Sequence, residues 1–156
     1  MNEAKEAEQI LGPGGAMQAF LEARKAGLIR FIGFSSHSEE TAVWLLDRFP
    51  FDSLLFPVNF DCWQEKKFGQ QILKQAQNRG TGILALKCLT RRPWVKGEKR
   101  QWPKCWYKPL EDPEEIKTAV RFTLSKPVTS AVSPGHPELL WRACDAADAF
   151  LPLSAE

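Results

Sequence analysis

The sequence predicts an α/β protein in which helices cover a mainly parallel sheet. Four short apolar runs alternate with amphipathic helical segments along the chain, and this alternation is typical of parallel strands joined by helices. The composition, 44% hydrophobic and 26% charged residues, is that of a foldable globular chain. The 156 residues suffice for one ordinary domain or for about half of a large α/β barrel.

The first expected elements are a helix, a strand and a second helix. Apolar residues recur at helical spacing over residues 15–26, and Gly27 stands where that helix should stop. The apolar run at 29–35 then predicts the first strand. Ser38, followed by two glutamates, is a good helix start, and Pro50 ends the apolar stripe of that helix.

Two further strands and one helix follow in the same order. The apolar run at 53–59 predicts the second strand. Apolar residues over 68–76 mark the next helix, and Gly80 closes it. The apolar run at 82–87 predicts the third strand, so the alternation of strand and helix continues.

The last part of the chain contains a fourth strand and two helices. Asp112 and the Pro-Glu-Glu after it combine an N-cap, a proline at the first helical position and two acids in the first turn. The run at 128–133 predicts the fourth strand, and Pro137 opens the last helix. We expect residues 90–111 to form a long basic, Trp-rich loop and residues 1–13 to be poorly ordered.

Charge and cysteine content exclude several classes of protein. The net charge of +2 gives no general reason to expect a nucleic-acid or membrane-surface protein. No apolar run approaches the ~20 residues of a membrane span, and the acidic N-terminus is unlike a secretory signal. We therefore expect a cytoplasmic protein. The cysteines lack metal-binding or disulfide-framework spacing and are expected to be reduced, with no metal site: Cys62, Cys88, Cys105 and Cys144.

Polar residues follow the expected strands, where parallel α/β proteins place their ligands. Ser35–Ser38 can bond a ligand or only cap the next helix. Pro134–Pro137 combines backbone N–H groups with a helix start, which suits an anion such as phosphate but also any tight turn.

The segment 91–108 has seven basic residues and one acid, a net charge of +6, interleaved with three tryptophans and a tyrosine. This composition suits a dinucleotide or a single-stranded nucleic acid, or else a solvated loop that covers the sheet. One basic loop is no continuous groove, and we expect no nucleic-acid partner. No nucleophile–base–acid set stands out, and the sequence has no G-x-S-x-G elbow, Walker loop or H-E-x-x-H motif.

Taken together, these segments resemble the C-terminal half of the aldo-keto reductases, NADP-dependent enzymes built on the eight-stranded TIM barrel. The resemblance implies a single half-barrel domain over residues 1–156, a partial TIM (β/α) barrel whose four parallel strands match barrel strands five to eight. It also implies an NADP-dependent oxidoreductase that reduces a small carbonyl substrate by hydride transfer from the reduced nicotinamide of NADPH. The resemblance rests on GGAMQAFLEARKAGLIRFIGFSSHS (14–38), FDSLLFPVNF (51–60), GILALKCL (82–89) and VRFTLSKPVTSAVSPGHPELL (120–140).

The resemblance carries cofactor-binding roles over to particular residues. Ser35 and Ser36 match the pair that holds the nicotinamide amide, with Ser36 in place of an asparagine, and Asn59 follows the second strand where the family has a glutamine. Lys87 stands where many members stack an aromatic ring on the nicotinamide. Lys87, Arg91 and Arg92 are expected to hold the pyrophosphate, and Gly135 and His136 the adenosine-side phosphate. The expected cofactor-binding residues are thus Ser35, Ser36, Asn59, Lys87, Arg91, Arg92, Gly135 and His136.

The catalytic Asp, Tyr, Lys and His of the family come from the other half of the barrel and have no counterpart here. Tyr107 lies in the wrong loop for a proton donor, and His37 belongs to the amide-binding turn. We therefore expect the chain alone to be inactive, as a truncated or split reductase. The alternative is a non-enzymatic nucleotide-binding or partner-dependent half-barrel. The resemblance implies that the partners of this chain are a dinucleotide and a carbonyl substrate. A complementary N-terminal half or a second copy of the chain is a further expected partner.

Overall fold

The computed structural model describes residues 1–64 and 67–153. The chain forms two compact units. Unit 1 comprises Met1–Phe56 and Phe68–Leu84, and unit 2 comprises Pro57–Lys67 and Ala85–Glu156. No helix in the described part of the chain is both long and apolar enough to cross a membrane.

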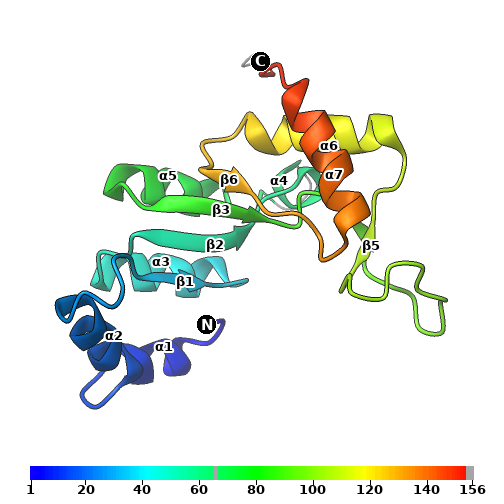
Figure 1. Ribbon diagram of the computed structural model, residues 1–156. Helices are drawn as coiled ribbons and strands as arrows, with labels where there is room; N and C mark the ends of the chain where they lie inside the picture. The colour runs from blue at the N-terminus through cyan, green and yellow to red at the C-terminus, as the bar shows by residue number, and fades with distance from the viewer. Residues whose placement is uncertain (65–66, 154–156) are drawn as a thin grey trace. The chain divides into compact units, whose positions relative to one another are not determined.

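The main sheet has four parallel strands in the order β1-β2-β3-β6, which confirms the predicted α/β fold class (Figure 1). All four strands are shorter than the predicted ones at 29–35, 53–59, 82–87 and 128–133. Before β1, for example, Ile32 exchanges hydrogen bonds with Asp52 through that residue's side chain as well as its backbone, so the regular ladder begins only at the next residue. The strands are β1 (Gly33–Ser35), β2 (Ser53–Pro57), β3 (Gly82–Leu86) and β6 (Ser130–Ala131).

The helices of unit 1 are α1 (Ala4–Leu11), α2 (Ala16–Lys25), α3 (Glu39–Arg48) and α5 (Gln70–Arg79), and α3 packs against both α1 and α5. Ser38 caps α3 by accepting a 3.1 Å hydrogen bond from the Thr41 N–H, as its position predicts. Gly80 ends α5 with φ +68°, a conformation that favours glycine.

The first thirteen residues, expected to be poorly ordered, contain helix α1. Its one buried residue is Ala7, which is fully enclosed. Because the helix places an alanine rather than a large apolar side chain in its contact, the sequence shows no apolar stripe from which to predict it.

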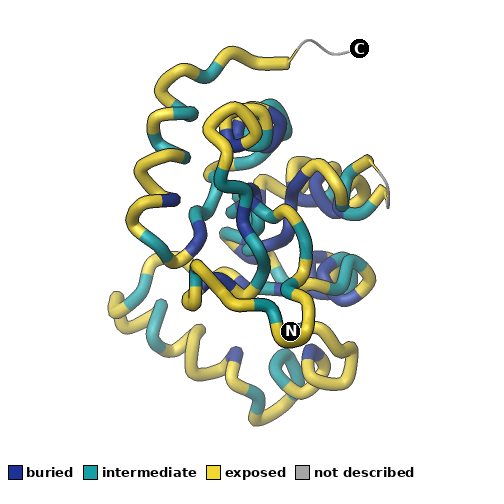
Figure 2. Tube along the Cα trace, turned by 90° about the vertical axis from the view of Figure 1, so that its right-hand side faces the viewer, coloured by how far each residue is buried: buried dark blue, intermediate teal, exposed yellow. Residues whose placement is uncertain are grey.

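Unit 2 contains α4 (Phe60–Gln64), α6 (Pro113–Leu124) and α7 (Pro137–Asp148), with α6 packed against α7. Asp112 caps α6 by accepting hydrogen bonds from the backbone N–H groups of Glu114 and Glu115 at 3.0 and 3.1 Å. Leu139 is the one fully buried residue of α7, whose remaining residues are exposed or half-buried (Figure 2).

The Trp-rich segment is a hairpin-like structure, which corrects the prediction of a loop over residues 90–111. Strands β4 (Thr90–Arg92) and β5 (Lys108–Pro109) pair in antiparallel fashion. The residues between them turn back because Glu98 binds Arg92 and Lys108, one from each strand. A core beneath the hairpin includes Cys88, Leu89, Cys105, Ile116, Val120 and Leu139.

Candidate functional site

The turn after β1 already uses the hydrogen-bonding groups of Ser36. Ser36 is fully buried, and its Oγ donates to the Ser38 carbonyl at 3.0 Å and accepts from the Ser38 N–H at 3.1 Å. The Ser36 N–H donates to the carbonyl of Leu55 on β2. A ligand at this turn therefore meets Ser35, which ends β1 and is half-buried, before it meets Ser36.

Asn2 also belongs to this turn, which sequence reasoning missed. Its Oδ1 accepts the His37 N–H at 2.7 Å, and its carbonyl accepts the Thr41 hydroxyl at 3.1 Å. More than thirty residues separate Asn2 from both partners in the chain. Only the folded chain brings these groups together, and no local pattern could indicate it.

Asn59, the expected amide-binding residue after β2, acts as a helix cap in unit 2. Its side chain is 5% exposed, and its Oδ1 accepts the Cys62 N–H of α4 at 3.0 Å. This bond satisfies one of the otherwise unpaired N–H groups at the start of that helix. The oxygen of the amide is therefore committed to the fold.

Lys87 directly follows β3 and takes an unusual backbone conformation. Its φ is +63°, in the left-handed region that residues other than glycine seldom adopt. The Lys87 carbonyl accepts the Thr90 N–H at 3.0 Å and closes a tight turn into β4. Such strained residues are frequent at functional sites, so this position is consistent with a binding role.

Arg91 and Arg92 are paired with carboxylates of the chain itself. Arg91 forms an ion pair with Glu115 of α6. Arg92 holds Glu98 with both terminal guanidinium nitrogens, at 2.8 and 2.9 Å. Hydrogen bonds from Arg92 and then from Lys108 lower the pKa of Glu98 well below its usual range. Each arginine thus binds an anion, as expected, but that anion is a glutamate of the same chain.

His136 is the N-cap of α7 and contacts the Trp-rich hairpin. Its Nε2 accepts the Lys104 N–H at 3.1 Å, and the Trp102 ring packs edge-on at 5.1 Å between centroids. Gly135 lies beside Lys104: a Cβ atom added at Gly135 would meet Lys104 at 3.7 Å, an ordinary van der Waals distance. The helix start predicted at Pro137 is thus formed, and the hairpin contacts it through Trp102 and Lys104.

A cavity of about 500 Å³ lies in unit 2, lined by residues that follow β2 and β3 in the chain and by residues of α6. Its apolar wall includes Phe60 and Phe122, whose rings meet edge to face at 5.4 Å between centroids. Its charged residues are Asp61, Arg91, Glu114 and Glu115, a net charge of −2. Among the expected cofactor residues, Asn59 and Arg91 line this cavity.

Burial raises the pKa of two side chains of unit 2, Cys88 in the cavity lining and Tyr107 in the hairpin. Burial raises the pKa of the Cys88 thiol to about 11, so it is protonated at neutral pH. Burial likewise raises the pKa of Tyr107 to about 12. Within residues 1–64 and 67–153, no group of three or more His, Cys, Asp or Glu side chains is placed to hold a metal ion.

The eight expected cofactor residues are divided between the two units. Ser35 and Ser36 lie in unit 1, and the other six lie in unit 2. Within unit 2, the hairpin brings His136 into contact with Lys104.

Comparisons with known proteins support the fold. No protein-family model and no curated protein matches the sequence. Among solved structures, the apo form of an aldo-keto reductase from Bacillus halodurans is similar at 20% identity with a TM-score of 0.63, covering 94% of this chain and 55% of that one. The holo form of the same enzyme is similar at 18% identity with a TM-score of 0.57, covering 90% and 50%. The chain thus spans about half the length of these structures, and its fold is that of half an aldo-keto reductase barrel.

Proposed function

We propose that this chain is the C-terminal half of an NADP-dependent, carbonyl-reducing barrel and carries part of its cofactor site. The observation that supports this proposal most is the match of 94% of the chain to about half of an aldo-keto reductase. When bound, NADPH supplies the hydride that reduces a carbonyl. This chain supplies groups that hold the dinucleotide, and the complementary half supplies the proton donor.

The described residues meet part of what a dinucleotide requires. Lys87 enters none of the ion pairs formed among the described residues, so its ammonium can face a phosphate without giving up such a partner. The start of α7 at Gly135 and His136 is a helix N-terminus, whose positive dipole end suits a second phosphate, and the His136 N–H itself already donates to the Pro134 carbonyl. Ser35 is the group proposed for the nicotinamide amide.

The remaining expected residues already have partners within the chain. A phosphate competes with Glu115 for Arg91 and with Glu98 for Arg92. The Ser36 hydroxyl and the Asn59 amide oxygen hold a turn and a helix cap. These internal pairs favour the partner-dependent form of the proposal, in which the isolated chain binds the dinucleotide weakly.

Catalysis is proposed to require a second half-barrel. Without a proton donor and the groups that tune its pKa, carbonyl reduction loses acid catalysis worth about 10²–10⁴ in rate, and electrostatic stabilisation as well. The test is NADPH oxidation by the chain with a panel of aldehydes, alone and with an N-terminal reductase half added. We expect background rates alone and turnover only in the mixture. Turnover of about 1 per second by the chain alone would contradict the proposal.

A further inference from the structure

The Trp-rich hairpin carries cations that the chain itself does not pair. Glu98 binds Arg92 and Lys108, and Arg91 is paired with Glu115. The other basic residues of the segment 91–108 enter none of the ion pairs formed among the described residues. The segment therefore keeps an excess of positive charge that attracts an anionic group. These residues are Lys96, Lys99, Arg100 and Lys104.

Lys104 has a defined place because the residue after it is anchored. Cys105 is only 3% exposed, its N–H donates to the Trp102 carbonyl at 3.0 Å, and its carbonyl accepts the indole N–H of Trp94 at 2.9 Å. The residues on either side of it, Lys104 and Trp106, are both exposed. The hairpin thus presents an ammonium group and an indole ring to solvent from two positions next to one buried residue.

Trp106 is an aromatic side chain without a partner ring or cation. Its exposed fraction is 92%, and it enters none of the ring stacking or cation–π contacts formed among the described residues. By contrast, the Arg100 guanidinium lies over the Trp94 ring at 5.7 Å. An exposed indole next to cations suits a ligand that combines a phosphate with an aromatic base, because bases stack on tryptophan.

His136 adds a hydrogen-bond donor beside Lys104. Its Nε2 accepts the backbone N–H of Lys104 at 3.1 Å, so the proton of the neutral ring lies on Nδ1. Nδ1 has no hydrogen-bond partner among the described residues. The acid of the first turn of α7, Glu138, is exposed and opposes an anion at this place.

We propose that Lys104 and Trp106, with the imidazole of His136, bind the adenosine end of the dinucleotide and make this chain prefer NADP to NAD. This inference rests on the proposed function. A phosphate monoester such as the 2′-phosphate of NADP carries close to two negative charges, whereas NAD has a hydroxyl group there. Lys104 and His136 contact that phosphate, and Trp106 stacks on the adenine, which both dinucleotides share.

The proposal is tested by calorimetric titration of the full chain with NADP and with NAD at low ionic strength. We expect NADP to bind about fivefold more tightly, since a cation at an exposed position contributes modestly to binding. Equal affinities for the two dinucleotides would overturn this inference and leave the proposed function standing. No measurable binding of either dinucleotide would overturn both.

Three variants assign the preference to these side chains. Lys104→Gln keeps the backbone bond to His136 and should lower the affinity for NADP to that for NAD, with the affinity for NAD unchanged. Trp106→Ala should weaken both dinucleotides about fivefold, because stacking on the base does not depend on the 2′ position. Glu138→Gln removes the opposing charge and should strengthen NADP binding about twofold.

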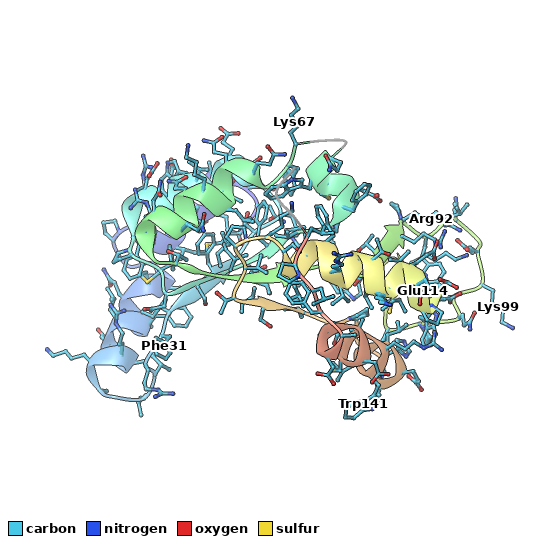
Figure 3. The ribbon with its side chains drawn as sticks, turned by 90° about the horizontal axis from the view of Figure 1, so that it is seen from above. Phe31, Lys67, Arg92, Lys99, Glu114 and Trp141 are labelled. Carbon is cyan, nitrogen blue, oxygen red and sulfur yellow. The ribbon has the colours of Figure 1, made fainter. Side chains whose placement is uncertain are left out.

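Two control variants make matched changes outside the hairpin. Lys74→Gln removes an exposed lysine of α5, and Trp141→Ala removes a tryptophan of α7 that is 65% exposed (Figure 3). Both should leave the two affinities unchanged. If Lys104→Gln weakens NADP and NAD alike, or if Lys74→Gln weakens NADP as much as Lys104→Gln does, the hairpin does not select the 2′-phosphate and the inference is wrong.

Discussion

At the scale of single residues, Glu98 organises the Trp-rich hairpin. It binds Arg92 from β4 and Lys108 from β5, and Figure 3 shows Arg92 near the base of the hairpin and Lys99 at its outer end. Glu98→Gln removes the charge from both contacts and should loosen the segment between the strands. Trypsin should then cleave after Lys99 or Arg100 several-fold faster, while Glu22→Gln in unit 1 should cause no change. Unchanged cleavage in the Glu98 variant would contradict this role.

The same residue predicts a pH dependence. Arg92 and Lys108 lower the pKa of Glu98 in the folded chain, so its contribution is fully present above the pKa of a free glutamate, about 4.3. It is lost as the pH falls through the lower folded value. The loss is followed by hydrogen exchange of the hairpin amides, whose protection factors, corrected for the pH dependence of intrinsic exchange, should fall below about pH 4 in the wild type. In Glu98→Gln the amides should exchange faster at neutral pH and show no such step.

Leu139 and Leu140 make a matched pair on α7. Leu139 is fully buried against the core under the hairpin, whereas Leu140 is 41% exposed. Leu139→Ala should lower the free energy of unfolding by about 2–5 kcal/mol through lost burial and a cavity. Leu140→Ala should cost less than about 1 kcal/mol. Urea denaturation of both variants measures the difference, and equal losses would show that α7 is not anchored through Leu139.

Single residues also show how much of the candidate site could be predicted from the sequence. The residues behind the strands can be predicted from the strand pattern and the family resemblance, as Ser35 and Lys87 illustrate. Their partners cannot, because Arg91 meets Glu115 and His37 meets Asn2 only after long stretches of chain have folded back. Whether an arginine is free for a ligand depends on those partners, so the charge of a loop alone overstates its capacity for anions.

At the scale of elements, the helix starts that depend on a capping residue next to the helix could be predicted from the sequence. Ser38 and Asp112 form the expected caps of α3 and α6. The short helix α4 and the hairpin strands were not. Unlike the equally short strands of the main sheet, they contain no continuous apolar run, since their sequences are FDCWQ, TRR and KP. Their stability comes from tertiary contacts, such as those of Glu98, rather than from local preference.

The cap of α6 gives a prediction at this scale. Asp112→Ala removes the acceptor for two N–H groups at the start of the helix that forms one wall of the cavity. We expect a loss of about 1 kcal/mol in the free energy of unfolding and a fall of about 2–4 °C in Tm. Asp112→Ser, which keeps an acceptor, should restore most of it. Thermal denaturation followed by circular dichroism checks both variants, and an unchanged Tm for Asp112→Ala would contradict the cap's role.

At the scale of the whole molecule, the four-stranded sheet explains why a partner is proposed. A closed eight-stranded barrel has no sheet edges, whereas an open parallel sheet has two. This chain matches about half of a solved reductase, and the polar groups expected to hold the cofactor are mostly bound to other parts of the chain. Both observations support a half that gains its function from a second half.

The most direct test of this account is the calorimetric titration of the full chain with NADP and with NAD at two ionic strengths. Half of a cofactor site loses contacts and preorganisation together, so we predict weak binding with a Kd of about 0.1–1 mM. Binding should weaken further at the higher ionic strength, because salt screens the attraction between the basic side chains and the phosphates. The absence of any measurable binding of either dinucleotide at millimolar concentration would contradict the proposal that this chain carries part of a dinucleotide site.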